Sequence, residues 1–400
     1  MRRFFVIALF SAAVLGACSR INVQSIDRED LFTIDIGRLE DQIDLYNLEG
    51  NRSIRKTRIT MRDGLFYISD GNGEKIVRYT SYGDLLFMIY NEETNPPPMT
   101  LRTNVNDQEL VTRWAFSYPL REPGEISVDS RKHIYVEDRL PAERHGFDSE
   151  TRALLDSTVL HFDADGRFVE YLGQEGIGGS PFPRINGIFT SYRDDLAVVC
   201  RLPVGWNIYW FDAQGALVYL IPILNEQIPV PPDREVWPSL DSISVAPDER
   251  KLYLKVDYYR DTYDESTNTK TGSVMDSSII WILNADDGSV ADTIEIPFYE
   301  RTFTENNRRV TEEVTYAMLG VIQGGRVLLS VPVEGGYAML VLRSGSPDQR
   351  RGFIRVDNEE LQFNDFSVSE DGILSGLLAT DWDAKVVWWR SDVLLGEFLQ

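Results

Sequence analysis

Residues 59–89 read ITMRDGLFYISDGNGEKIVRYTSYGDLLFMI, which contains four apolar segments. The first two are separated by Asp63-Gly64, and the last two by Gly83-Asp84. β-branched and aromatic residues dominate the apolar segments, while Asp and Gly are residues that tight turns favour. This stretch therefore predicts four consecutive antiparallel strands.

The same phrase occurs six times along the chain. The turns between its first two apolar segments align at Asp63, Asp129, Asp194, Pro247, Gly324 and Asp371. Repeats of this size are typical of solenoids and propellers, in which each unit packs against its neighbours. With almost no helical periodicity, the repeat predicts an all-β fold, a six-bladed β-propeller of four-stranded antiparallel blades. The blades are expected at about 55–90, 124–172, 185–223, 240–297, 314–356 and 361–399, and the fourth strand of the last one is expected at Val393.

Two other architectures fit parts of this pattern. One is a pair of β-sandwiches, and the other is a seven-bladed ring in which LFTIDI (residues 31–36) begins a further blade. A closed ring has no exposed strand edges, and an N-terminal strand added to the last blade would close it. We therefore predict that residues 31–36 complete the last blade and that residues 31–400 form one propeller.

The N-terminus has the features of an export signal. Arg2 and Arg3 precede an apolar run over 4–15, which is short for a membrane-spanning helix. The run ends in LGAC (residues 15–18), which resembles the lipobox of bacterial lipoproteins. A secretory signal with an incidental cysteine, or an uncleaved anchor, are the alternatives.

The lipobox resemblance implies a signal peptide over 1–17, acylation of Cys18 with fatty acids such as palmitate, and a tether over 18–30. Several acyl chains together anchor a protein stably to a membrane. The expected location is the bacterial cell envelope. Ser19 is not the Asp that retains many lipoproteins at the inner membrane, so the outer membrane, facing the periplasm, is favoured.

Charge and cysteine content narrow the classes of function. The chain has 63 acidic and 40 basic residues, a net charge of −23. Such a chain is a poor candidate for binding nucleic acid, because phosphates require clusters of Lys and Arg. Cys18 and Cys200 are the only cysteines, so a lipidated Cys18 leaves no intramolecular disulfide. Cys200 ends an apolar run and is expected to be a buried strand residue.

A family resemblance rests on two phrases. ISVD (residues 126–129) with IYV (residues 134–136), followed by VLHFDADGRF (residues 159–168), is similar to NHL-type six-bladed propellers. More narrowly, the chain resembles uncharacterised propeller lipoproteins of spirochaetes. The resemblance implies the fold and a habit of binding partners, and it implies no reaction.

Long insertions are expected on one face of the disc. First-to-second and third-to-fourth turns of a blade share one face, and these turns are short. The other face carries second-to-third loops and blade-to-blade links, which include residues 91–124, 137–157, 173–187, 225–241, 257–278 and 298–315. Loops on a rigid scaffold commonly carry binding residues, so we expect function on this face, which we name the insertion face.

Large aromatic and Arg residues are candidates for partner binding, because both are enriched at interface hot spots. Within these insertions lie Trp114, Phe116, Tyr118, Trp237, Tyr258, Tyr259 and Arg139, while Trp206 and Arg201 belong to blade three and Trp382 belongs to blade six. The principal hypothesis is a membrane-anchored, non-enzymatic binding or scaffold protein that recognises a protein or envelope partner. A carbohydrate- or small-ligand-binding module built on Trp206, Trp237 and Trp382 is an alternative.

A metal-dependent hydrolase of the lactonase-like propeller type is a further alternative. Asp70, Glu137, Asp257 and Asp381 follow second strands, which places them near the channel mouth on the insertion face. Carboxylate oxygens suit Ca²⁺, so these four are weak metal candidates. No cofactor and no catalytic residue is predicted, since no His pair has metal-ligand spacing.

Overall fold

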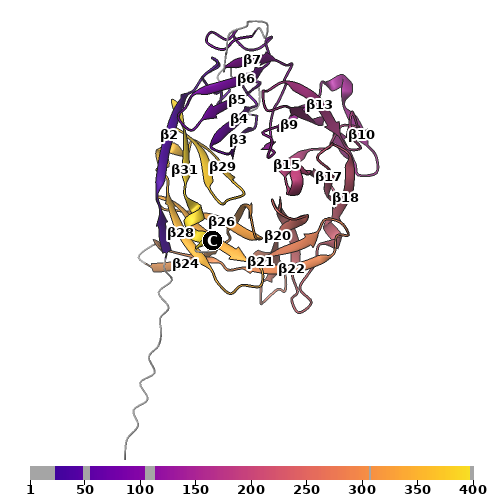
Figure 1. The fold of residues 1–400 in the computed structure, drawn as a ribbon. Coiled ribbons are helices and arrows are strands. Elements are labelled where there is room, and N and C mark those ends of the chain that lie inside the picture. The colour runs from indigo at the N-terminus through magenta and orange to yellow at the C-terminus, as the bar shows by residue number, and fades with distance from the viewer. Residues whose placement is uncertain (1–22, 48–54, 104–112, 306–307, 397–400) are drawn as a thin grey trace, which may run out of the picture.

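The computed structural model describes residues 23–47, 55–103, 113–305 and 308–396. Within these residues, six large sheets stand in a ring around a central axis, as Figure 1 shows. The predicted six-bladed β-propeller is confirmed. Separate sheets in one ring do not fit the β-sandwich alternative. The signal peptide, Cys18 and the start of the tether lie outside the described residues.

The first three blades follow the repeat in chain order. Blade 1 contains β3 (Thr57–Arg62), β4 (Leu65–Asp70), β5 (Lys75–Thr80) and β6 (Leu85–Tyr90), and β7 (Trp114–Ser117) adds to β6 in parallel. Blade 2 contains β8 (Ile126–Val128), β9 (Ile134–Arg139), β12 (Ser157–Phe162), β13 (Phe168–Gly173) and β14 (Gly176–Ile177). Blade 3 contains β15 (Ile185–Thr190), β16 (Leu196–Leu202), β17 (Gly205–Phe211) and β18 (Leu217–Leu224).

The last three blades complete the ring. Blade 4 contains β19 (Trp237–Val245), β20 (Lys251–Tyr263), β21 (Lys270–Asn284) and β22 (Val290–Ile296). Blade 5 contains β25 (Ala317–Ile322), β26 (Arg326–Val333), β27 (Gly336–Arg343) and β28 (Arg350–Arg355). Blade 6 contains β29 (Phe363–Val368), β30 (Leu374–Ala379) and β31 (Asp383–Trp389).

The N-terminal segment closes the ring. β2 (Arg28–Asp35) pairs antiparallel with β31 and is the outer strand of blade 6, as predicted for residues 31–36. β1 (Val23–Ile26) pairs in parallel with β28 of blade 5. Both strands begin within residues 18–30, the range predicted for the tether. The predicted fourth strand at Val393 is wrong, because the 3₁₀ helix η5 (Ser391–Leu395) lies there.

The core is divided among the contacts between blades. Six clusters of buried apolar side chains each draw mainly on two neighbouring blades, and blades 6 and 1 share one of them. Alternate residues of a strand point to opposite faces of its sheet, so each blade packs on both sides. This explains why the strands are nearly continuous apolar runs. No helix in the described part of the chain is long and apolar enough to cross a membrane.

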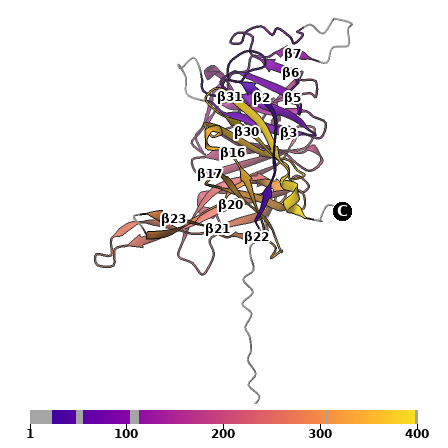
Figure 2. The same ribbon diagram turned by 90° about the vertical axis from the view of Figure 1, so that its left-hand side faces the viewer.

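The insertions form short elements of their own. β10 (Gly146–Asp148) and β11 (Ala153–Leu155) pair as a hairpin in blade 2. β23 (Tyr299–Glu305) and β24 (Arg308–Val314) form a hairpin between blades 4 and 5. In Figure 2 that hairpin projects well beyond the disc. The remaining helical turns are 3₁₀ segments at Ala142–Arg144, Tyr192–Asp194, Asn225–Gln227 and Asn358–Glu360.

Candidate functional site

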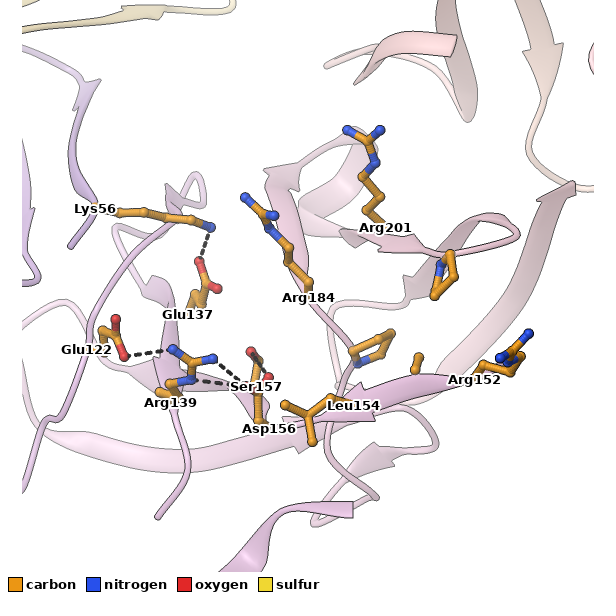
Figure 3. Close-up of a pocket in the computed structure, with 13 residues that line it drawn as sticks. Lys56, Glu122, Glu137, Arg139, Arg152, Leu154, Asp156, Ser157, Arg184 and Arg201 are labelled. Atoms are coloured by element: carbon orange, nitrogen blue, oxygen red, sulfur yellow. Dashed lines mark hydrogen bonds and ion pairs between the residues drawn. The ribbon is translucent and has the colours of Figure 1, made fainter. Parts of the chain in front are cut away.

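A cleft opens between blades 2 and 3 at the insertion face, and we name it the blade 2–3 cleft. Its volume is about 460 Å³. Apolar walls come from residues such as Leu154, Pro183 and Pro203. Its charged lining residues are Lys56, Glu122, Glu137, Arg139, Arg152, Asp156, Arg184 and Arg201, as Figure 3 shows. Five cations therefore face three carboxylates, in a chain whose net charge is −23.

The carboxylates of the cleft are held in ion pairs. Lys56 Nζ donates to Glu137 Oε2 at 2.8 Å. Arg139 donates to Asp156 Oδ2 at 2.6 Å and to Glu122 Oε2 at 3.1 Å. Burial raises the pKa of Glu137, and the Lys56 ammonium opposes that rise. These pairs leave the negative groups of the cleft already neutralised.

Arg184 and Arg201 are arranged differently. Arg201 donates its backbone N–H to the Arg184 carbonyl at 2.9 Å, one step beyond the Ile185–Cys200 pair of β15 and β16. Directly opposed residues of an antiparallel pair point to the same face of the sheet. Both residues are exposed, and among the described residues neither side chain has a carboxylate partner. The cleft thus has two neighbouring cations without counter-ions.

Local packing holds this end of blade 3. Arg201 lies opposite Trp206 of β17, with its guanidinium carbon 5.2 Å from the ring centroid. Lys56 Nζ donates to the Ile185 carbonyl at 2.9 Å, which brings a third cation beside the start of β15. In Figure 3, Arg184 and Arg201 extend in similar directions from neighbouring strands, and the Lys56 ammonium lies beside Arg184.

The four weak metal candidates do not form a site. Asp70 accepts from the backbone N–H groups of Asp44 and Gly73. Glu137 pairs with Lys56, Asp257 accepts from Lys255 Nζ at 2.8 Å, and Asp381 is exposed. The described residues contain no group of three or more His, Cys, Asp or Glu side chains that could hold a metal ion. The ligand set expected for a metal-dependent hydrolase is therefore not assembled.

Five of the aromatic candidates pack within the fold. Trp206 and Tyr258 are buried in the core between blades 3 and 4, which corrects their assignment as surface anchors. Trp114 and Tyr118 are half-buried against the core between blades 1 and 2. Phe116 is also half-buried, with the Arg167 guanidinium carbon 5.8 Å from its ring centroid.

Three aromatic candidates reach the surface. Trp382 is 83% exposed and Trp237 is 44% exposed. Trp237 stacks on the half-buried Tyr259, with ring centroids 4.8 Å apart. Trp206, Trp237 and Trp382 belong to three different blades, and Trp206 is buried, so the proposed three-tryptophan carbohydrate site is not assembled.

The cleft brings together three candidate residues predicted from the sequence, among them the metal candidate Glu137, with others that were not predicted. Arg139 and Arg201 were candidates and line the same cleft. Lys56, Arg152 and Arg184 were missed. Lys56 and Arg184 stand just before the inner strands of their blades, a position that could have marked them as residues of the insertion face.

Comparisons with known proteins found structural similarity at low sequence identity. No protein-family model matches the chain, and no curated protein matches it. The solved structures similar to it include a streptogramin B lyase, at 12% identity and a TM-score of 0.37, covering 85% of this chain and 95% of that one. They also include a family PL25 ulvan lyase bound to -[GlcA(1-4)Rha3S]-, at 10% identity and a TM-score of 0.39, covering 92% and 84%.

A third similar structure is the propeller domain of the Trilobed protease from Pyrococcus furiosus. It has 11% identity and a TM-score of 0.38, covering 84% of this chain and 94% of that one. Similarities at this level assign no activity, ligand or partner. The class of protein is a six-bladed β-propeller, defined by its own sheets.

Proposed function

We propose that this protein is a non-enzymatic binding or scaffold protein that recognises a protein or other envelope partner through its insertion face. The observation that carries the proposal is that the long insertions lie on one face of the disc and the short turns lie on the other. The hairpins β10–β11 and β23–β24 and the extended end of β20–β21 all lie in second-to-third loops or blade-to-blade links. The turns of the opposite face, which we name the short-turn face, are short.

The chemistry of the insertion face supports recognition. It presents an exposed Trp382, an aromatic stack of Trp237 on Tyr259, and the blade 2–3 cleft. Exposed aromatic and Arg side chains supply most of the energy at many protein interfaces. The carboxylates of the cleft are engaged in ion pairs with Lys56 and Arg139, which favours binding over proton transfer.

The proposal includes a lipid anchor at Cys18 and a location in the bacterial envelope, on the outer membrane facing the periplasm. Its support is the order of basic start, apolar run and LGAC over residues 15–18. The similarity to NHL-type propellers and to spirochaete propeller lipoproteins belongs to the same proposal, on the strength of the repeat phrases quoted above.

Matched aromatic variants on the two faces test the binding face. Trp382→Ser with Trp237→Ser alters the insertion face, while Tyr82→Ser with Tyr192→Ser alters the short-turn face, where those two tyrosines are 89% and 38% exposed. Each protein is used as bait for affinity capture from detergent-solubilised membranes. We expect a partner captured by the wild type to be lost with the tryptophan variant and kept with the tyrosine variant. Capture that survives the tryptophan variant, or depends only on the tyrosines, would contradict the proposal.

A further inference from the structure

We propose that Arg184 and Arg201 form an oxyanion-binding pair in the blade 2–3 cleft, which recognises a carboxylate or phosphate group of a ligand. This inference rests on the proposed function and deepens it, because it names the chemistry that one part of the insertion face recognises. The starting observation is that two arginines oppose each other directly across β15 and β16.

Two directly opposed arginines are unfavourable unless a negatively charged group lies near them. Like charges directly opposite each other on a sheet destabilise it. The chain contains 63 acidic residues, yet none of those described pairs with Arg184 or Arg201. The three carboxylates of the same cleft pair with Lys56 and Arg139 instead. A local conflict of this kind, kept within an otherwise consistent fold, is typical of a functional site.

The positions of the two side chains are built into the sheet. The β15–β16 register shifts between Ile185 and Gly187, and this bulge brings Arg184 opposite Arg201. Bulges re-aim side chains and are frequent beside functional sites. Pro183 and Pro203, which line the cleft, restrict the backbone just before Arg184 and just after β16. Trp206 packs beside the Arg201 guanidinium.

The chemistry of the pair fits a planar or tetrahedral oxyanion. A guanidinium presents its N–H donors as a rigid fork that matches carboxylate and phosphate oxygens. Two adjacent guanidiniums on one sheet face can surround such a group from two sides. The cleft of about 460 Å³ leaves room for a small molecule or the end of a longer chain. Since the protein as a whole is strongly acidic, the attraction is local, and we expect affinity to fall as salt is added.

The chain offers a matched control. Arg326 and Arg343 also oppose each other directly, across β26 and β27 of blade 5. They lie at the short-turn face, where Arg326 donates to the Gln323 carbonyl. The hollow beside them is only about 50 Å³. The same double substitution there removes equal charge without touching the blade 2–3 cleft.

The test is titration calorimetry of the purified protein with citrate, which carries carboxylates, and with inorganic pyrophosphate. We expect one-site binding of at least one probe, and the stronger probe identifies the source of the oxyanion. Arg184→Gln with Arg201→Gln should weaken binding by about tenfold or more. Arg326→Gln with Arg343→Gln should leave it unchanged. Binding of neither probe, or equal weakening in both double variants, would overturn the inference.

Thermal unfolding separates lost binding from misfolding. Without a probe, the Arg184→Gln/Arg201→Gln variant should be at least as stable as the wild type, because the like-charge pair is gone. The bound probe should raise the unfolding temperature of the wild type only. If no anion binds while capture still depends on Trp382 and Trp237, this inference fails and the proposed function stands. If anion binding depends on Arg184 and Arg201 but partner capture is unchanged by the Trp382 and Trp237 substitutions, the proposed function fails instead.

Discussion

Arg28 and Glu360 form a bidentate ion pair that joins the start of β2 to the segment that leads into the last blade. Arg28 Nη2 donates to Glu360 Oε1 at 2.9 Å, and Arg28 Nη1 donates to Oε2. Lys385 Nζ donates to the same carboxylate at 2.8 Å. The pair is partly buried and spans 332 residues of sequence, so it connects the two ends of the chain at the point where the ring closes.

Removing this pair should weaken ring closure. Arg28→Met leaves a mostly buried carboxylate with only Lys385, and we expect a loss of about 2 kcal/mol in the free energy of unfolding. The hydrogen bond from Arg28 lowers the pKa of Glu360 to about 2. Since this folded pKa lies below the ordinary value of 4.5, the contribution is present above pH 4.5 and is lost as the pH falls toward 2.

Urea unfolding over this pH range measures the effect. Glu360→Gln should remove the part of the acid sensitivity that Glu360 causes. Arg355→Met is a suitable control, because its ion pair with Asp357 is largely exposed. An Arg28→Met variant no less stable than the Arg355→Met variant would contradict this role in closure.

Asp138 should make stability depend on pH in the opposite direction. Burial raises its pKa to about 7, although the backbone N–H groups of Glu122 and Arg121 favour the carboxylate. A folded pKa above the ordinary 3.8 means that folding favours protonated Asp138. Its contribution is therefore complete below pH 3.8 and is lost as the pH rises through about 7.

The variant Asp138→Asn keeps an acceptor but cannot ionise. Relative to the wild type, its free energy of unfolding should increase by more than about 1 kcal/mol as the pH rises through this window. Unfolding in urea at several pH values checks the trend. A difference between the two proteins that does not change with pH would show that Asp138 stays ionised in the folded state.

Lys255 is a buried cation at the base of the long hairpin β20–β21. Its ammonium lies 2.8 Å from Asp257 Oδ1 and 3.2 Å from Asp241 Oδ2. Lys255→Met should destabilise the protein by about 3 kcal/mol, because it leaves Asp257 buried without its cation. Adding Asp257→Asn to that variant should recover part of the loss. Urea unfolding of Lys255→Met, Asp257→Asn and the double variant measures the coupling. If the loss of stability in the double variant equals the sum of the two single losses, Lys255 and Asp257 are not coupled.

Cys200 should be unreactive in the folded protein. The side chain is fully buried, and burial raises the pKa of its thiol well above the ordinary value. In a Cys18→Ala variant it is the only thiol, so labelling with Ellman's reagent reports on it alone. We expect labelling in urea and almost none in native buffer. Rapid native labelling would mean that the contact between blades 2 and 3 opens readily.

Cys18 is predicted to carry the membrane anchor. Cys18→Ala removes the acylated thiol, so the protein should move from the membrane fraction to the soluble fraction. Ser19→Ala is a neighbouring control that should leave fractionation unchanged. A Cys18→Ala protein that stays in the membrane fraction would rule out anchoring through this residue.

Much of the fold could be predicted because its signals are local. Asp63-Gly64 marks a turn and ITM and LFYI mark strands by composition alone, and the repeat shows how many blades to expect. The prediction failed at Val393, where an apolar residue near the C-terminus suggested a strand. The outer position of blade 6 was already filled by β2, so residues 391–395 form a 3₁₀ helix instead.

The candidate site was less accessible to sequence reasoning. Exposure of an aromatic residue in or near a loop is decided by what packs over it, which is why Trp206 and Tyr258 proved to be buried while Trp382 is exposed. Asp70, Glu137 and Asp257 lie within β4, β9 and β20 rather than after these strands, and the partner of Glu137 comes from a distant segment. Lys56 reaches Glu137 across 81 residues.

The sequence by itself determined the six-bladed ring and the face that carries the insertions, because strand alternation and turn composition act over a few residues. Only the tertiary structure decided that Arg184 opposes Arg201. Counting back along the hairpin from the Thr190–Leu196 pair without a bulge would place Ile185 opposite Arg201. The shift between Ile185 and Gly187 moves the register by one residue and brings the two cations together. Such a bulge depends on how blade 3 packs between its neighbours, and no local pattern of residues specifies it.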